Sequence, residues 1–181
     1  MKRITILLFL SVFCFATATQ AQAPKPDPEL KKLTVFLGHW TYEGESKPGP
    51  LGPGGKYTGE YTARMILGGF FGQARWAEKG ASGETRSLEI VGYDPVNKNL
   101  VSNGYEDGGG TWSGVLNVSG SGYTYTGKYF LAGKQYLIRV AATFGLDLMS
   151  MTWKQEISVD GKTWTPLREG KWTKVPSAPK K

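Results

Sequence analysis

Few side chains in this sequence could carry out nucleophilic or metal chemistry. His39 is the single histidine and Cys14 the single cysteine among 181 residues. One histidine cannot supply a site with two histidine ligands, and no serine lies in the glycine pattern of a nucleophile elbow. Alternation along a strand also places His39 on the face opposite Trp40. We therefore predict no catalytic residues, no metal site and no cofactor.

Charged residues within predicted strands are the next candidates. In a small antiparallel barrel one face of each strand meets solvent, so most of these charges are expected outside. Two alternatives stay open. Inward arginines beside tyrosines would clamp an anion, because a guanidinium binds a carboxylate through two hydrogen bonds. An inward carboxylate with a raised pKa, such as Glu43 or Glu156, would suit an enzyme. The mid-strand charges are Glu43, Glu45, Glu60, Glu89, Glu156, Arg64, Arg75 and Arg139.

Aromatic side chains are the strongest chemical feature and make up 13% of the residues. Tyr123, Tyr125 and Tyr129 alternate, so they share one face of a strand. Such rings either fill a barrel core or line a mostly apolar pocket with a few polar tips. The pocket interpretation predicts a non-enzymatic protein that binds a small hydrophobic or amphipathic ligand. Its candidate ligand-binding residues are Tyr61, Trp76, Tyr93, Tyr105, Tyr125, Arg139 and Trp153.

Three tryptophans near predicted turns support a second interpretation. If Trp112, Trp164 and Trp172 are exposed, a filled barrel could contact carbohydrate or another envelope component through its outer surface. Buried indoles would contradict this alternative.

Residues 1–23 have the three parts of a secretory signal peptide. A basic start precedes an apolar run over residues 4–16, and small residues lead to possible cleavage after Ala21 or Ala23. The run is too short for a membrane span. Cleavage removes Cys14, which excludes disulfides, and lowers the formal net charge from +7 to +5 by removing Lys2 and Arg3. We expect an exported protein, periplasmic or extracellular.

The remaining positive charge does not indicate a nucleic-acid partner. Lysines are spread along the chain and cluster only at Lys180 and Lys181, and no stacking motif for single strands is present. The sequence leaves the oligomeric state open.

The elements that would position these side chains begin with a short helix. Residues 24–27 form a proline-rich linker, and Asp27 followed by Pro28 is typical of a helix start. Apolar residues then recur at a spacing of three and four, which predicts an amphipathic helix over 28–37. Gly38 is expected to end it.

Ten strand patterns follow, separated by glycine-rich turns. Sequential antiparallel strands must hide their edges, and an up-and-down barrel does so completely. A two-sheet sandwich is the alternative. We predict one barrel domain over 28–173 and a disordered tail over 174–181. The predicted strands are 39–46, 57–67, 70–79, 84–93, 99–105, 111–118, 123–131, 135–144, 148–159 and 163–173.

Several short motifs carry a resemblance to a known family. They are Leu37-Gly-His-Trp40, Leu67-Gly-Gly-Phe-Phe71, Glu89-Ile-Val-Gly-Tyr-Asp94 and Trp153 before Asp160-Gly161. In this order they resemble an uncharacterised family of bacterial domains with a lipocalin-like (calycin) β-barrel, over about residues 28–173. The resemblance implies a barrel with a cavity and carries no activity. It also implies that Gly38, Trp40 and Arg168 close the barrel, with Arg168 stacked on Trp40.

Overall fold

The computed structural model describes residues 23–176. Nearly all of the predicted signal segment 1–23, and residues 177–181 of the predicted tail, lie outside this range. Among the described residues, no helix combines the length and apolar character needed to cross a bilayer.

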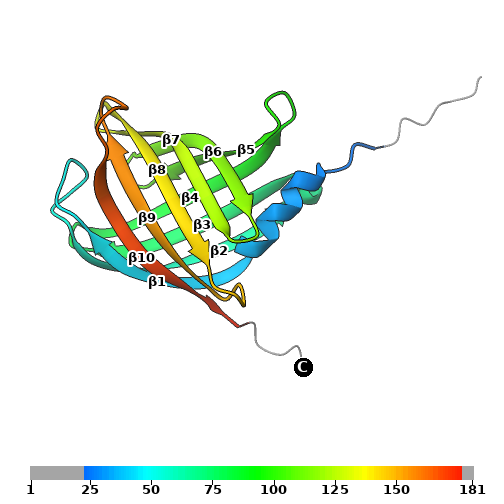
Figure 1. The fold of residues 1–181 in the computed structure, drawn as a ribbon, viewed down its shortest axis with the longest axis horizontal. Helices are drawn as coiled ribbons and strands as arrows, with labels where there is room; N and C mark the ends of the chain where they lie inside the picture. Colours follow the sequence, from blue (N-terminus) through cyan, green and yellow to red (C-terminus); the bar gives the residue numbers. More distant parts are fainter. Residues whose placement is uncertain (1–22, 177–181) are drawn as a thin grey trace, which may run out of the picture.

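Ten antiparallel strands form a closed barrel in which each strand pairs with its neighbours in sequence (Figure 1). The predicted up-and-down barrel is therefore confirmed, and the sandwich alternative is wrong. The strands are β1 (Gly38–Ser46), β2 (Gly55–Ile66), β3 (Phe71–Gly80), β4 (Gly83–Asp94), β5 (Asn99–Glu106), β6 (Thr111–Ser119), β7 (Gly122–Leu131), β8 (Lys134–Phe144), β9 (Ser150–Ser158) and β10 (Thr165–Val175).

Pairing between the first and last strands closes the barrel. β1 runs antiparallel to β10, with Trp40 opposite Lys174 and Ser46 opposite Arg168. Closure leaves no strand edge open for another chain. β10 continues two residues beyond the predicted end of the domain, and the Lys174 amide donates to the Met149 carbonyl at 2.8 Å. The tail therefore begins later than predicted.

The predicted helix is present as a 3-10 helix, η1 (Pro28–Phe36), at one end of the barrel, away from the β1–β2 loop (Figure 1). Asp27 caps it, because its carboxylate accepts from the Glu29 amide at 2.9 Å. Leu30 and Leu33 are buried on its inner side. Gly38 has φ +105°, a conformation that glycine adopts without strain, and it turns the chain into β1. A second 3-10 turn, η2 (Leu67–Gly69), joins β2 to β3.

Trp40 anchors the junction between η1 and the barrel. Its side chain is 1% exposed, and its indole nitrogen donates to the Phe36 carbonyl at 3.0 Å. The expectation that Arg168 covers this ring is wrong. Lys174 does so, with its Nζ 5.1 Å from the ring centroid. The register gives the reason, since Arg168 lies opposite Ser46, six residues along β1 from Trp40.

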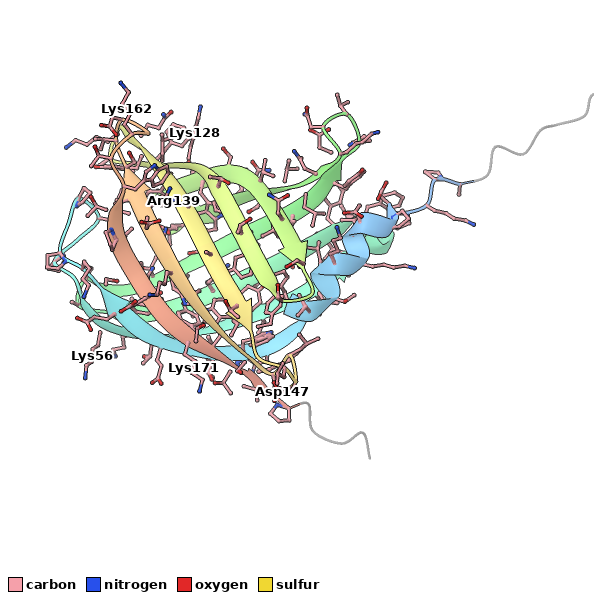
Figure 2. All side chains as sticks on the ribbon, viewed as in Figure 1. Lys56, Lys128, Arg139, Asp147, Lys162 and Lys171 are labelled. Atoms are coloured by element: carbon pink, nitrogen blue, oxygen red, sulfur yellow. The ribbon has the colours of Figure 1, made fainter. Side chains whose placement is uncertain are left out.

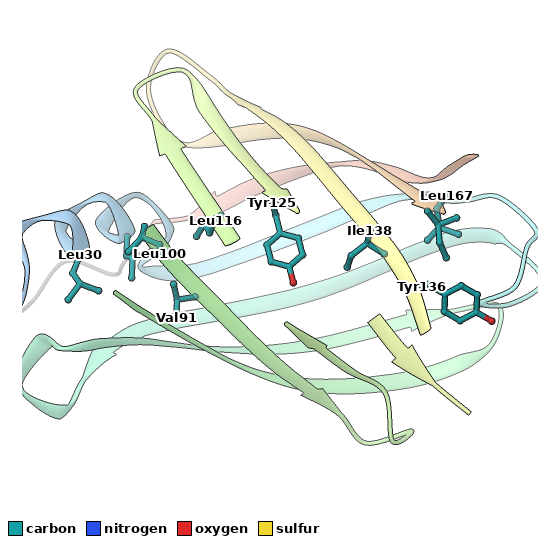
Figure 3. Packing of buried hydrophobic residues seen from close by; sticks show 10 residues of the cluster. Leu30, Val91, Leu100, Leu116, Tyr125, Tyr136, Ile138 and Leu167 are labelled. Atoms are coloured by element: carbon teal, nitrogen blue, oxygen red, sulfur yellow. The ribbon is translucent and has the colours of Figure 1, made fainter. Parts of the chain in front are cut away.

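Inward side chains form two connected clusters along the barrel. One is mainly aliphatic and extends from Leu30 beneath η1, past Tyr125, toward Leu167 at the far end (Figure 3). The other is aromatic and centres on Trp172, whose ring lies 5.0 Å from those of Tyr42 and Trp76. Edge-to-face and offset contacts of this kind stabilise aromatic cores.

Glycines make room for these rings on neighbouring strands. Gly59 lies opposite Tyr42, and a Cβ there would come within 2.3 Å of the tyrosine ring. Gly44 lies opposite Tyr57 in the same way, and a Cβ on Gly44 would come within 2.3 Å of the Tyr57 hydroxyl. The high glycine content is therefore part of the interior packing as well as of the turns.

Lysines and other charged side chains project from the outer surface, including Lys56, Lys128, Lys171 and Arg139 (Figure 2). His39 also lies outside, with its Nε2 3.6 Å from Glu60 Oε2.

Candidate functional site

The barrel encloses a cavity of about 360 Å³. The cavity reaches the end of the barrel formed by the β1–β2 loop and the β3–β4 turn, opposite η1. Leu51 of the β1–β2 loop is partly buried and contributes to the lining. The Lys47 amide, at the start of this loop, donates to the Leu167 carbonyl at 2.7 Å. This hydrogen bond holds the start of the β1–β2 loop beside the cavity entrance.

An ion pair joins two cavity-lining side chains near this end. Arg168 of β10 donates through Nη2 to Glu78 Oε2 of β3 at 2.6 Å, and both side chains are about one quarter exposed. The Arg168 guanidinium also lies 4.0 Å over the Tyr57 ring. Burial raises the pKa of the Tyr57 hydroxyl to about 12, and that hydroxyl donates to the Glu169 carbonyl at 2.8 Å. These contacts fix the guanidinium in place.

Two further carboxyl groups line the cavity. Glu106 of β5 accepts from the Tyr129 hydroxyl at 2.7 Å, and burial raises the pKa of this carboxyl. Glu89 of β4 lies deeper and accepts from Ser102, which is itself buried. Burial raises the pKa of Glu89 as well, although hydrogen bonds from Ser102 and Trp112 act in the opposite direction.

Several hydrogen-bonding groups around the cavity have no partner. A buried polar group without a partner costs about 1–3 kcal/mol, so such groups are rare in native proteins. Among the described residues, six such atoms belong to side chains that line this one cavity. They are Nε1 of Trp76, Trp153 and Trp172, Nε of Arg168 and the hydroxyls of Tyr42 and Tyr125. All six can donate a hydrogen bond to an acceptor that reaches them.

Comparison with known families agrees with this architecture. The model of the family described as "Protein of unknown function (DUF1579)" matches residues 25–174, which is nearly the whole barrel with its linker. This chain belongs to the DUF1579 family. The resemblance inferred from its motifs, to a family of uncharacterised barrel domains, is confirmed. No curated protein matches the chain.

Two solved structures align with this DUF1579 chain. The crystal structure of Rv2717c from M. tuberculosis aligns with a TM-score of 0.61 at 14% identity, over 84% of this chain and 100% of that one. At this identity the likeness shows the fold alone. A de novo designed fluorescence-activating β-barrel aligns with a TM-score of 0.41 at 13% identity, over 78% of this chain and 94% of that one.

Four of the seven ligand-binding candidates line the cavity of the DUF1579 barrel. Tyr61, Trp76, Tyr125 and Trp153 come from β2, β3, β7 and β9, and two-residue alternation points each of them inward. Tyr61 and Trp76 meet edge to face, with ring centroids 4.9 Å apart. Strand phase was therefore sufficient to find these positions.

The other three candidates lie outside the cavity lining. Tyr105 is 55% exposed, because it alternates with the inward Glu106. Arg139 pairs with Glu156 on the outer face and lies 4.4 Å over the Trp164 ring. Tyr93 is half-buried at the η1 end and packs against the aliphatic cluster. The sequence could not tell which of two alternating faces each of these strands buries.

The tryptophans behind the carbohydrate alternative are not exposed. Trp172 is buried, Trp112 lines the cavity, and Trp164 is half-buried beneath Arg139. The outer surface therefore lacks the indole platform on which that interpretation depended.

The charged residues of the site were mostly missed. Both carboxylates named as possible catalytic groups lie on the outer face, where Glu43 is exposed and Glu156 pairs with Arg139. Arg64 and Arg75 are exposed as well. The inward charges are Glu78, Glu89, Glu106 and Arg168. A signal for Glu78 existed, since it lies two residues after Trp76 and so shares its face. Within residues 23–176, no group of three metal-ligating side chains comes together.

Proposed function

We propose that this protein is exported and that its barrel binds one small, largely apolar ligand bearing hydrogen-bond acceptor oxygens, without catalysing a reaction. The observation that carries the proposal is the set of six partnerless donor groups on side chains around a single cavity. A bound acceptor would offset the cost of leaving these groups unpaired.

The dimensions and lining of the cavity support this proposal. A volume of about 360 Å³ lies within the ligand-pocket range of roughly 300–1,000 Å³, which suits a molecule of modest size. The walls combine aromatic and aliphatic side chains with polar and charged groups, which can orient a bound molecule. Export is supported by the signal-like segment, and the family match begins just after it, at residue 25.

Binding is tested with N-phenyl-1-naphthylamine, an uncharged probe whose fluorescence rises in apolar surroundings. We expect saturable, stoichiometric binding to the wild-type protein. Val140→Phe places a ring inside the cavity and should weaken binding by at least about tenfold, because a packed interior has little free space.

Ala141→Phe is the matched control, since Ala141 is the next residue on β8 and is exposed. It should bind the probe as the wild type does. Thermal unfolding of both variants checks that the barrel is intact. If the wild type does not bind the probe, or if both variants bind it equally, the cavity is not a binding site.

A further inference from the structure

Arg168 is the one basic side chain deep in the described cavity lining, and it is already paired. Lys47 and Lys56 also contribute to the lining, but both are exposed at its rim. The Arg168 guanidinium is held on one side by Glu78 at 2.6 Å and on its face by the Tyr57 ring. A ligand carboxylate would normally bind this group through two charge-assisted hydrogen bonds. Glu78 already occupies part of that position.

The ion pair is held by strands far apart in sequence. β3 and β10 are separated by β1 and β2 in the barrel, so the bond between Glu78 and Arg168 reaches past two intervening strands near the cavity entrance. Glu78 follows Trp76 on the inward face of β3. A register shift between Pro166 and Arg168 interrupts the pairing of β10 with β9, and both Leu167 and Arg168 line the cavity.

The other deep charges are carboxyl groups. Glu106 lies close enough to interact electrostatically with both Arg168 and Glu78, and Glu89 lies deeper among Tyr61, Tyr123 and Tyr125. An entering anion would meet a cation that is already neutralised and two further acidic groups. An anion without a free cationic partner would lose its hydration in a site of low dielectric, and this cost strongly disfavours such a ligand.

We propose that Glu78 is the specificity-determining residue of this cavity: it occupies the Arg168 guanidinium, so that the barrel accepts uncharged amphiphiles and rejects carboxylates. The inference rests on the proposed function and adds the chemical class of the ligand. A hydroxyl, ester or ketone oxygen can accept from the free Arg168 Nε and from the indole N–H groups, and it brings no charge into the cavity.

The test compares two competitors that differ only in the head group, decan-1-ol and decanoate at pH 8, as displacers of N-phenyl-1-naphthylamine. Decanol enters any apolar site more readily than decanoate, so the informative quantity is how Glu78→Gln changes the ratio of their affinities. In the variant, Arg168 is left without its anion. Decanoate should gain about tenfold or more relative to the wild type, while decanol should change little.

Two variants complete the design. Glu84→Gln removes a carboxylate from the exposed outer pair with Lys79 and should leave both affinities at wild-type values. Glu78→Gln combined with Arg168→Gln should lose the gain for decanoate, because the cation is gone. If Glu78→Gln proves too unstable for titration, its thermal unfolding is measured with each competitor. Decanoate should then raise the melting temperature of the variant more than that of the wild type.

The outcomes separate this inference from the proposed function. If neither competitor displaces the probe from the wild type, the binding function itself fails. If both bind and Glu78→Gln leaves their affinity ratio and the thermal response to decanoate unchanged, Glu78 does not set the specificity.

Discussion

At the scale of single residues, the interior is defined by acidic groups placed among aromatic rings. Glu89 has no basic partner in the described cavity lining and is stabilised by Ser102 and Trp112. Removing a carboxylate from water disfavours its charged form, which raises the pKa of Glu89. The protonated, neutral form of Glu89 is therefore favoured in the folded barrel. The unfolded chain exposes the same group to water, where it ionises normally.

This difference predicts how stability depends on pH. Above the ordinary glutamate pKa of 4.5, the folded protein retains the Glu89 proton while the unfolded chain releases it. The folded state then binds more protons, so the free energy of unfolding falls as pH rises through this window, until Glu89 ionises in the folded state too. Each unit of pKa difference corresponds to about 1.4 kcal/mol.

Glu89→Gln should remove this component of the pH dependence. Urea unfolding at pH 5 and pH 8 is expected to show a smaller loss of stability for the variant than for the wild type. Glu60→Gln changes an exposed carboxylate on the outer face and should behave as the wild type. Parallel pH dependences for wild type and Glu89→Gln would contradict the assignment.

At the scale of elements, η1 closes one end of the barrel and the β1–β2 loop lies at the other. η1 contributes Leu30 and Leu33 to the aliphatic cluster, and Trp40 joins the helix to β1 through the Phe36 carbonyl. 3-10 helices are usually short, because their hydrogen bonds have poorer geometry than those of an α-helix. At nine residues, η1 is unusually long for this type. Packing of Leu30 and Leu33 against the barrel therefore stabilises it, in addition to the local Asp27 cap.

Leu33→Ala tests how much this closure contributes to stability. Leu33 is 3% exposed, and a Cβ on Gly72 would come within 3.1 Å of its side chain. Truncation leaves a cavity in a tight junction and should lower the free energy of unfolding by about 2–5 kcal/mol. Lys32→Ala, on the exposed side of the same helix, should cost less than about 0.5 kcal/mol. Chemical denaturation provides both values, and equal costs would show that η1 is only loosely attached.

At the scale of the whole molecule, the barrel is closed by hydrogen-bonded pairing between its first and last strands, β1 and β10. Residues of β1 pair with residues of β10 more than 120 positions later. Aromatic rings line much of the interior wall, around the cavity in which we propose that a ligand binds. The proposed export and ligand binding belong to this scale, because they concern the complete chain.

Native mass spectrometry of protein produced with its own residues 1–23 tests both properties together. We expect a mass that lacks the segment ending at Ala21 or Ala23, together with a stoichiometric adduct that solvent extraction removes. Protein made without residues 1–23 and refolded from denaturant is the control, and it should show the bare mass. An unprocessed chain would contradict export. Absence of the adduct would count against tight binding, which the probe titration measures independently.

The sequence alone determined the number, order and approximate limits of the ten strands, the helix start at Asp27 and the inward phase of Tyr61, Trp76, Tyr125 and Trp153. These features follow from local rules, namely alternation, capping and glycine turns, that act over a few residues. Only the tertiary structure decided which charges meet inside. Glu78 and Arg168 are 90 residues apart, and β10 has a register shift beside Arg168. Strand phase is local, whereas register and closure depend on the whole barrel. For that reason the sequence analysis wrongly predicted that Arg168 stacks on Trp40. It also wrongly included Arg139 and Tyr105 among the residues that face the cavity.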